Sequence, residues 1–145
     1  MVNNILIFRT DRIGDLLYTC PALLTIKNNL SNAQITLIAS KKNFACAKSL
    51  QIFDKVDLFP QESLVSKIKF IYYLSKLKFD YIFHLAAVSD INKVRNVPSD
   101  TIETNILGTT NILEACRKNK VKRFIFASSV YSYGSSGNLY TTSKT

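Results

Sequence analysis

The 145-residue sequence contains three cysteines, an odd number, and none of them forms a C-x-x-C pair. Such a set offers neither a disulfide framework nor the paired thiolates of a structural zinc site, and it fits a reducing cytoplasm. No apolar run reaches the roughly 20 residues that a bilayer requires, and the first one is short and followed by charges, unlike a signal peptide. We therefore expect a cytoplasmic protein with no metal site and no membrane span.

Glycine is also scarce, with four residues in the whole chain and no G-x-x-G-x-x-G arrangement. A loop that binds a dinucleotide needs closely spaced glycines, so that backbone amides can approach the pyrophosphate. The turn after the first apolar run reads RTDRIGDLL and contains Gly14 alone, between Asp11 and Asp15. Two carboxylates would repel phosphate, so the sequence lacks the usual anchor for a dinucleotide.

Acidic residues are few, 10 against 19 lysines and arginines, which gives a net charge of +9. A charge of this size can attract nucleic acid, but the basic residues are scattered along the chain. Their densest group, residues 117–123, lies where a helix is expected to end, and cations are stabilised there by the helix dipole. No nucleic-acid-binding motif accompanies the charge, so we predict no nucleic-acid partner.

What the sequence does contain is a regular alternation of apolar runs and helical patterns. Strands are expected at residues 4–10, 33–40, 55–60, 79–87 and 122–129. Helices are expected at residues 16–30, with a break at Pro21, and at 42–53, 63–78 and 99–119, the last capped by Ser99. This alternation predicts a single Rossmann-like α/β domain over residues 1–145. Its parallel sheet would have about five strands in the order 3-2-1-4-5, with helices on both faces.

Functional side chains in such sheets collect at the carboxyl ends of the strands. Near the last of these ends the motif YTTSK places Tyr140 and Lys144 four residues apart. On a helix the two side chains would share a face, and the ammonium would favour the phenolate, as a proton-transfer pair requires. The spacing is common in proteins, so by itself it leaves a catalytic and a chance pairing both open.

Residues 79–145 carry FDYIFHLAA, then TIETNILGTTNILEACRKNKVKRFIFASSVYSYG, then YTTSK. In this order the motifs resemble the NAD-dependent epimerases and dehydratases of the extended short-chain dehydrogenase/reductase family, which act on nucleotide sugars. The resemblance implies NAD(P) as cofactor, a nucleotide sugar as substrate, and a homo-oligomer as a possible assembly. Because the glycine-rich loop is absent, we expect the cofactor to bind weakly.

The same resemblance implies roles for individual residues. Tyr140 corresponds to the catalytic base, and Lys144 to its partner, which also holds the nicotinamide ribose. Ser129 corresponds to the hydroxyl that positions the substrate, and Asn105 to the helix asparagine beneath this network. The backbone that lies along the dinucleotide corresponds to Ala86 and Ala87.

Some of these residues also have a purely structural interpretation. Ser129 could satisfy backbone groups at a strand end, and Asn105 could line a polar pocket. His84, the only histidine, is more often a packed strand residue than a base.

The first half of the chain is similar to a different family. Through DRIGD, PAL and KFDYIF, residues 3–83 resemble glycosyltransferase family nine, the lipopolysaccharide heptosyltransferases. This resemblance implies that Asp15 is the base for an acceptor hydroxyl, although Asp15 could equally be a helix-start residue stabilised by the dipole. We interpret the chain as a hybrid, with a glycosyltransferase-like portion at 1–79 and a truncated epimerase/dehydratase-like portion at 80–145.

Three functional hypotheses follow from these patterns. The first is a catalytically incomplete epimerase/dehydratase-family protein that acts on nucleotide sugars. The second is a glycosyltransferase family nine fragment, and the third is a non-catalytic binding domain. Both enzyme hypotheses point to the assembly of cell-surface polysaccharide, including lipopolysaccharide.

Overall fold

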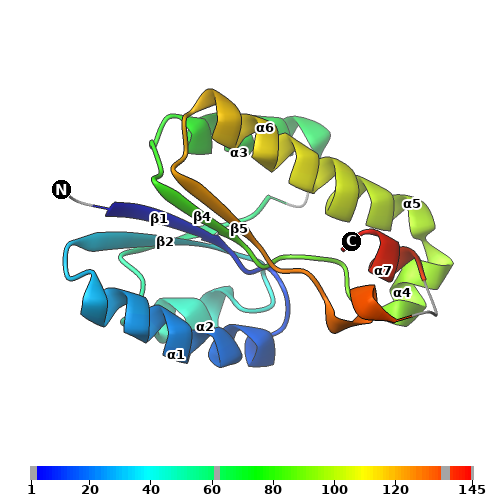
Figure 1. Ribbon diagram of the computed structural model, residues 1–145, viewed down its shortest axis with the longest axis horizontal. Helices are drawn as coiled ribbons and strands as arrows, with labels where there is room; N and C mark the ends of the chain where they lie inside the picture. The colour runs from blue at the N-terminus through cyan, green and yellow to red at the C-terminus, as the bar shows by residue number, and fades with distance from the viewer. Residues whose placement is uncertain (1–2, 61–62, 135–137, 145) are drawn as a thin grey trace.

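The computed structural model describes residues 3–60, 63–134 and 138–144, whose strands form one sheet (Figure 1). The sheet has five strands in the order β3-β2-β1-β4-β5, and every pairing between these strands is parallel. The strands are β1 (Asn3–Phe8), β2 (Ala33–Ala39), β3 (Lys55–Leu58), β4 (Tyr81–His84) and β5 (Arg123–Phe126). The predicted fold class and strand order are therefore confirmed.

Helices cover both faces of the sheet. One face carries α1 (Ile13–Asn29) and α2 (Phe44–Ser49), and the other carries α3 (Leu64–Ser75) and α6 (Gly108–Lys118) (Figure 1). The central strand β1 supplies both cores, because successive side chains of a strand point to opposite faces. Ile5 and Ile7 belong to the core on the α1 side, whereas Leu6 and Phe8 belong to the core on the α3 side. Burial on both faces explains why this strand is an unbroken apolar run.

Helix α1 begins earlier than the sequence predicts and is not divided at Pro21. It starts at Ile13, inside the expected turn, because the Asp15 carboxylate at the third helical position accepts the Arg12 amide, which is one half of a capping box. It also continues through Pro21, so the predicted break was wrong. Pro21 lacks the amide hydrogen that would donate to the Leu17 carbonyl. Leu17 lies on the exposed side of the helix, so a water molecule can donate to this carbonyl instead.

The predicted helix over residues 99–119 is divided into three segments. They are α5 (Pro98–Thr101), the π-helix η1 (Ile102–Leu107) and α6, and a further helix, α4 (Ile91–Asn96), lies in the expected loop. Ser99 is not the N-cap, because Pro98 takes the first helical position, which suits its fixed φ and missing amide, and Val97 precedes it as the cap. The π-helical turn was not predicted, and such turns are frequent at functional sites.

The chain beyond β5 folds back over the carboxyl ends of the strands. It forms the short 3-10 helix η2 (Val130–Tyr133) and the single-turn helix α7 (Leu139–Thr142), which lies near α4 and α5 (Figure 1). Asn138 caps α7 by accepting a hydrogen bond of 2.9 Å from the Thr141 amide. In the described part of the chain, no helix has the length and apolar character needed to cross a bilayer.

Candidate functional site

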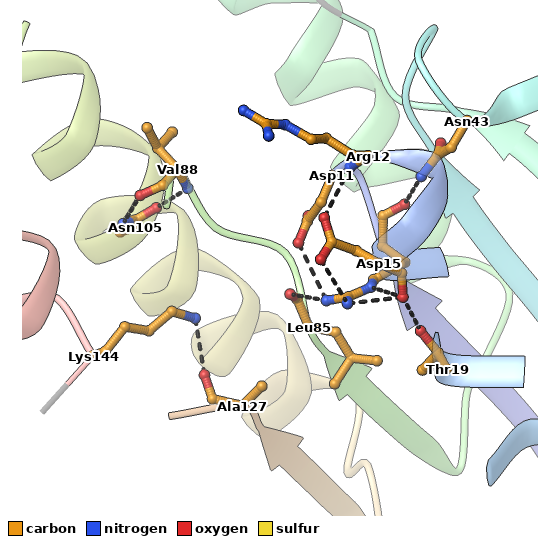
Figure 2. Close-up of polar contacts among 11 residues, drawn as sticks. Asp11, Arg12, Asp15, Thr19, Asn43, Leu85, Val88, Asn105, Ala127 and Lys144 are labelled. Carbon is orange, nitrogen blue, oxygen red and sulfur yellow. Dashed lines mark hydrogen bonds and ion pairs between the residues drawn. The ribbon is translucent and has the colours of Figure 1, made fainter. Parts of the chain in front are cut away.

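The candidate site lies at the carboxyl ends of β1, β4 and β5 (Figure 2). The turn after β1 contributes Arg9, Asp11 and Asp15, the segment after β4 contributes residues 85–88, and the segment after β5 contributes residues 127–129. The parallel topology brings these three segments to one edge of the sheet, as expected for this fold class.

Arg9 fills the turn after β1. Its Nη1 donates to Asp11 Oδ2 at 3.2 Å and to the Leu85 carbonyl at 3.1 Å. Its Nε and Nη2 both donate to the Asp15 carbonyl, at 3.1 and 2.9 Å. The guanidinium therefore joins the end of β4 to the first turn of α1, and its planar set of donors is used within the protein.

Asp11 is a largely buried carboxylate, with its side chain 14% exposed. One oxygen is bound by Arg9, and the other, Oδ1, has no hydrogen-bond partner among the described residues. Burial raises the pKa of Asp11, the Arg9 guanidinium opposes this effect, and the Asp15 carboxylate adds to it. The turn after β1 thus presents a poorly solvated acidic group where a dinucleotide-binding loop would present amides.

Neither Asp15 nor Gly14 gives the turn after β1 the character of a dinucleotide-binding loop. Asp15 Oδ2 accepts the Arg12 amide at 3.2 Å, and its Oδ1 lies 3.8 Å from Arg9 Nη2. Asp15 therefore acts as a helix-start residue, the structural interpretation of its position. A Cβ atom at Gly14 would meet no other described protein atom within 4 Å, so no neighbouring segment of the chain requires a glycine here. The residues of this turn do not fit a dinucleotide pyrophosphate.

Lys144 is a buried cation at the opposite side of the site, with a residue exposure of 3%. Its Nζ donates to the Ala127 carbonyl at 2.9 Å (Figure 2). The same atom lies 4.5 Å from the centroid of the Phe126 ring. Its own carbonyl accepts a hydrogen bond of 2.8 Å from Ser128 Oγ. Burial lowers the pKa of Lys144, the Asp11 carboxylate opposes this effect, and the Arg9 guanidinium adds to it.

Tyr140 lies half-buried on α7, close in sequence to Lys144 but not on a continuous helix with it. The helix ends at Thr142, and the Lys144 amide bonds to the Thr141 carbonyl at 2.9 Å in a tighter turn. Within the described residues the two side chains are not joined by a hydrogen bond. Their catalytic pairing stays a prediction.

Asn105 connects two parts of the site from inside the π-helix η1. It is 4% exposed, and its Oδ1 accepts the Val88 amide at 2.8 Å. Its Nδ2 donates to the Val88 carbonyl at 3.2 Å and to Ser143 Oγ at 2.9 Å (Figure 2 shows the Val88 pair). The side chain thus fixes the segment after β4 and the turn that follows α7.

The remaining residues that the sequence singled out occupy the same edge. Ser129 is half-buried and caps η2, with its Oγ 3.4 Å from the Tyr131 amide. Ala86 and Ala87 lie half-buried between the carboxyl end of β4 and Val88. Roles for these residues in binding substrate or dinucleotide stay predictions.

His84 is a packed strand residue rather than an accessible base. It is 5% exposed, and its Nε2 lies 2.9 Å from Thr109 Oγ1. The single hydroxyl proton of Thr109 goes to the Asn105 carbonyl at 2.6 Å, so His84 Nε2 must carry the hydrogen. Burial, with a smaller contribution from the Lys144 ammonium, lowers the pKa of His84 to about 4. The imidazole is therefore neutral at physiological pH.

Sequence reasoning missed several polar residues that organise this edge. They are Arg9, Thr109, Ser128 and Ser143. Their common signal is a position within a few residues of a strand end (Arg9 and Ser128), or within four residues of a residue already singled out (Thr109 and Ser143). Serine and threonine have this position in many proteins without a special role, so the signal does not separate them from other hydroxyls.

The sheet order, the site at its carboxyl edge and the helices on both faces define a Rossmann-like α/β domain. The chain belongs to the NAD dependent epimerase/dehydratase family, whose match covers residues 20–145. The family match therefore begins well before residue 79, where we expected the epimerase-like portion to start, and includes most of the segment compared with glycosyltransferase family nine.

Individual relatives agree with this family. Bifunctional protein GAL10 of Candida maltosa is 28% identical over 111 residues, which are 77% of this chain and 68% of the relative. UDP-glucose 4-epimerase of Caenorhabditis elegans is 33% identical over 92 residues, which are 63% of this chain and 25% of the relative.

Solved structures share the fold. The UDP-Glc/GlcNAc 4-epimerase of Campylobacter jejuni matches 98% of this chain with a TM-score of 0.73 at 24% identity. Pen of Bacillus thuringiensis also matches 98%, with a TM-score of 0.72 at 22% identity. The matched region covers 46% and 42% of those two chains, so this chain spans less than half of their length.

Proposed function

We propose that this chain contributes to an enzyme that transfers a proton to and from a hydroxyl of a nucleotide sugar. Tyr140 is the proton-transferring group, and Lys144 is the cation that favours its phenolate. The observation that carries this proposal is the burial of Lys144 at the carboxyl end of β5, next to the turn that carries Tyr140. The family match and the UDP-sugar epimerases among the relatives support the class of substrate.

The chemistry follows from the charges at this edge. A buried ammonium with one protein hydrogen bond stabilises a neighbouring anion more strongly than an exposed one would, because water screens it less. Ser129 is half-buried in the segment after β5, whose residues Ala127 and Ser128 contact Lys144, and it offers a hydroxyl to the substrate. With this field holding Tyr140 as the phenolate, its oxygen would accept the sugar hydroxyl proton and become a neutral phenol, leaving the sugar oxygen as the anion.

The NAD(P) cofactor that the family implies is a separate matter. Because the Arg9, Asp11 and Asp15 cluster does not fit a pyrophosphate, we propose that NAD binds weakly, and we derive no reaction step from it. We further propose that the 145-residue chain is catalytically incomplete by itself, that it acts in the cytoplasm, and that its product serves cell-surface polysaccharide assembly.

The glycosyltransferase hypothesis, with Asp15 as a base, is the weaker candidate. Asp15 is half-exposed at the sheet edge, which leaves its carboxylate accessible to an acceptor sugar. However, it also closes the capping box of α1, and the epimerase/dehydratase match extends through residues 20–83. The division into portions 1–79 and 80–145 is retained as part of this second hypothesis.

An NMR titration of the isotopically labelled chain separates these hypotheses. We expect UDP-glucose to shift the amide signals of Ser129, Tyr140 and Lys144, and glucose alone to shift them less. Shifts confined to the turn around Asp15 would instead favour the glycosyltransferase hypothesis. No shift at any of these residues, with a folded spectrum, would leave only a non-catalytic binding domain.

A further inference from the structure

Two hydrogen-bonded links meet at Asn105, and the directions of both can be determined. In the first, His84 Nε2–H donates to Thr109 Oγ1, and the Thr109 hydroxyl donates to the Asn105 backbone carbonyl at 2.6 Å. A hydroxyl has one proton, so Thr109 can only accept from the imidazole. This link attaches the π-helix η1 to the buried strand β4.

The second link leaves Asn105 through its side chain. Ser143 Oγ donates to the Tyr140 carbonyl at 2.8 Å, so it must accept the Asn105 Nδ2–H that lies 2.9 Å away. The other Nδ2 hydrogen and Oδ1 are both bound to Val88, which fixes the orientation of the amide. Asn105 is therefore satisfied only in one orientation, and Ser143 is the group through which it reaches the turn after α7.

This arrangement compensates for the shortness of α7. A single helical turn is not stable by itself, and residues near the end of a helix fray unless other contacts hold them. Here Ser143 is buried at 9% exposure and Lys144 at 3%, so both are held against the sheet edge. On the β5 side, Ser128 and the Ala127 carbonyl hold Lys144, and on the η1 side the contact passes through Ser143.

We propose that Ser143 is a positioning residue that transmits the rigid His84–Thr109–Asn105 connection to the Tyr140–Lys144 turn. The proposal rests on the proposed function only for the catalytic role of Tyr140 and Lys144. The contacts that position the turn do not depend on any activity. Ser143 contacts neither substrate nor reacting atoms. It keeps Lys144 buried at the strand ends, where the charged groups that influence its ammonium are Asp11 and Arg9, and where the ammonium in turn lowers the pKa of the neutral His84.

The test measures the environment of Lys144 in the whole chain without a substrate. The chain is labelled with ¹³C at the lysine ε carbon, Lys144 is assigned by comparison with Lys144→Met, and its pKa is followed by NMR. In Ser143→Ala we expect the pKa of Lys144 to rise toward that of an exposed lysine, because the side chain is released to water. In Thr142→Ala we expect no change, because this neighbouring hydroxyl is exposed and bonds only to Asn138 at 3.3 Å.

Two further variants keep the proposal testable if Ser143→Ala does not fold. Thr109→Val breaks the link from His84, whereas Thr110→Val removes a hydroxyl whose hydrogen bond among the described residues goes to the Ile106 carbonyl of η1 at 2.9 Å. We expect the first to raise the Lys144 pKa and the second to leave it unchanged. Ser143→Thr keeps the hydroxyl and should leave the pKa of Lys144 at the wild-type value. Ser143 borders a hollow of about 420 Å³, which has room for the added methyl group.

The outcomes are distinct from those that test the proposed function. A Lys144 pKa that is unchanged in both Ser143→Ala and Thr109→Val would overturn the positioning role, even if the chain binds UDP-glucose. A rise in both variants supports the role, even if the UDP-glucose titration shows no binding. A rise in Thr142→Ala or Thr110→Val of equal size would also overturn it, because the effect would then be general loosening of α7 or α6.

Discussion

Asn105 and Ser143 are 38 residues apart in the sequence, yet the side-chain amide of the first donates to the hydroxyl of the second at 2.9 Å. This contact joins the π-helical turn η1 to the residue that directly precedes Lys144, in the turn that follows α7. It explains how a helix of four residues, Leu139–Thr142, is fixed at the sheet edge although it is too short to be stable alone.

Replacement of Asn105 by alanine should reduce the free energy of unfolding by about 2–3 kcal/mol, because Val88 and Ser143 would lose their buried partners. Urea denaturation measures this change. Asn29→Ala is the matched control, since Asn29 is exposed and bonds only to the Thr25 carbonyl of its own helix. The control should stay within about 0.5 kcal/mol of the wild type. Equal losses in the two variants would contradict the buried network.

Stability should decrease on acidification because of His84. Its pKa is about 4 in the folded chain and about 6.5 when unfolded, so between these pH values only the unfolded chain binds the proton. Unfolding is therefore favoured as the pH falls from 6.5 to 4, by about 3 kcal/mol in total at about 1.4 kcal/mol per pKa unit. Urea denaturation across this range should show that His84→Gln has a smaller pH dependence than the wild type. Parallel curves for the two proteins would show that His84 is not buried as a neutral group.

Arg9→Lys should destabilise the chain by about 2 kcal/mol even though the charge is kept. A lysine ammonium cannot reach Asp11, the Leu85 carbonyl and the Asp15 carbonyl in the planar arrangement of a guanidinium. Arg12→Lys is the control, because Arg12 is exposed and forms only a long contact of 3.4 Å with Asp90. A thermal or urea midpoint for Arg9→Lys equal to that of the control would refute the central role of Arg9.

NAD should bind to the wild-type chain no more tightly than about millimolar, or about −4 kcal/mol. Asp11→Asn removes a buried negative charge from the turn after β1 and should tighten binding by about tenfold. Titration calorimetry with NAD measures both values, and adenosine, which has no phosphate, should bind the two proteins equally. A micromolar constant for the wild type would show that the turn after β1 accepts a pyrophosphate after all.

The fold was predictable because its signals are local and repeated. The apolar runs of β1 and β2 and the helical patterns between the strands gave the sheet order without any knowledge of contacts. The predicted helix boundaries were wrong where one residue is compatible with two different local structures. Pro21 is compatible with a helix whose exposed side can be hydrated, and Pro98 starts a helix that Ser99 was expected to cap.

The candidate site was predictable only in part. Asn105, Ser129, Tyr140 and Lys144 were singled out because ordered motifs resemble those of a family, and the topology brings them to one edge, but their roles stay predictions. The contacts of Arg9 and Ser143 could not be foreseen, because both bind groups supplied by distant segments. The π-helical turn that directs Asn105 inward has no sequence signal that separates it from an ordinary helix.

The order of strands also has a consequence for synthesis of the chain. β1 pairs with β2, where Asn3 is opposite Ala33, and with β4, where Ile5 is opposite Tyr81. A ribosome delivers β2 long before β4, so the nascent chain passes through a stage in which one edge of β1 is complete and the other is open. An unpaired apolar edge is a site of aggregation. The interval between the emergence of Ala39 and that of Tyr81 is therefore the stage of translation at which this edge of β1 has no partner strand.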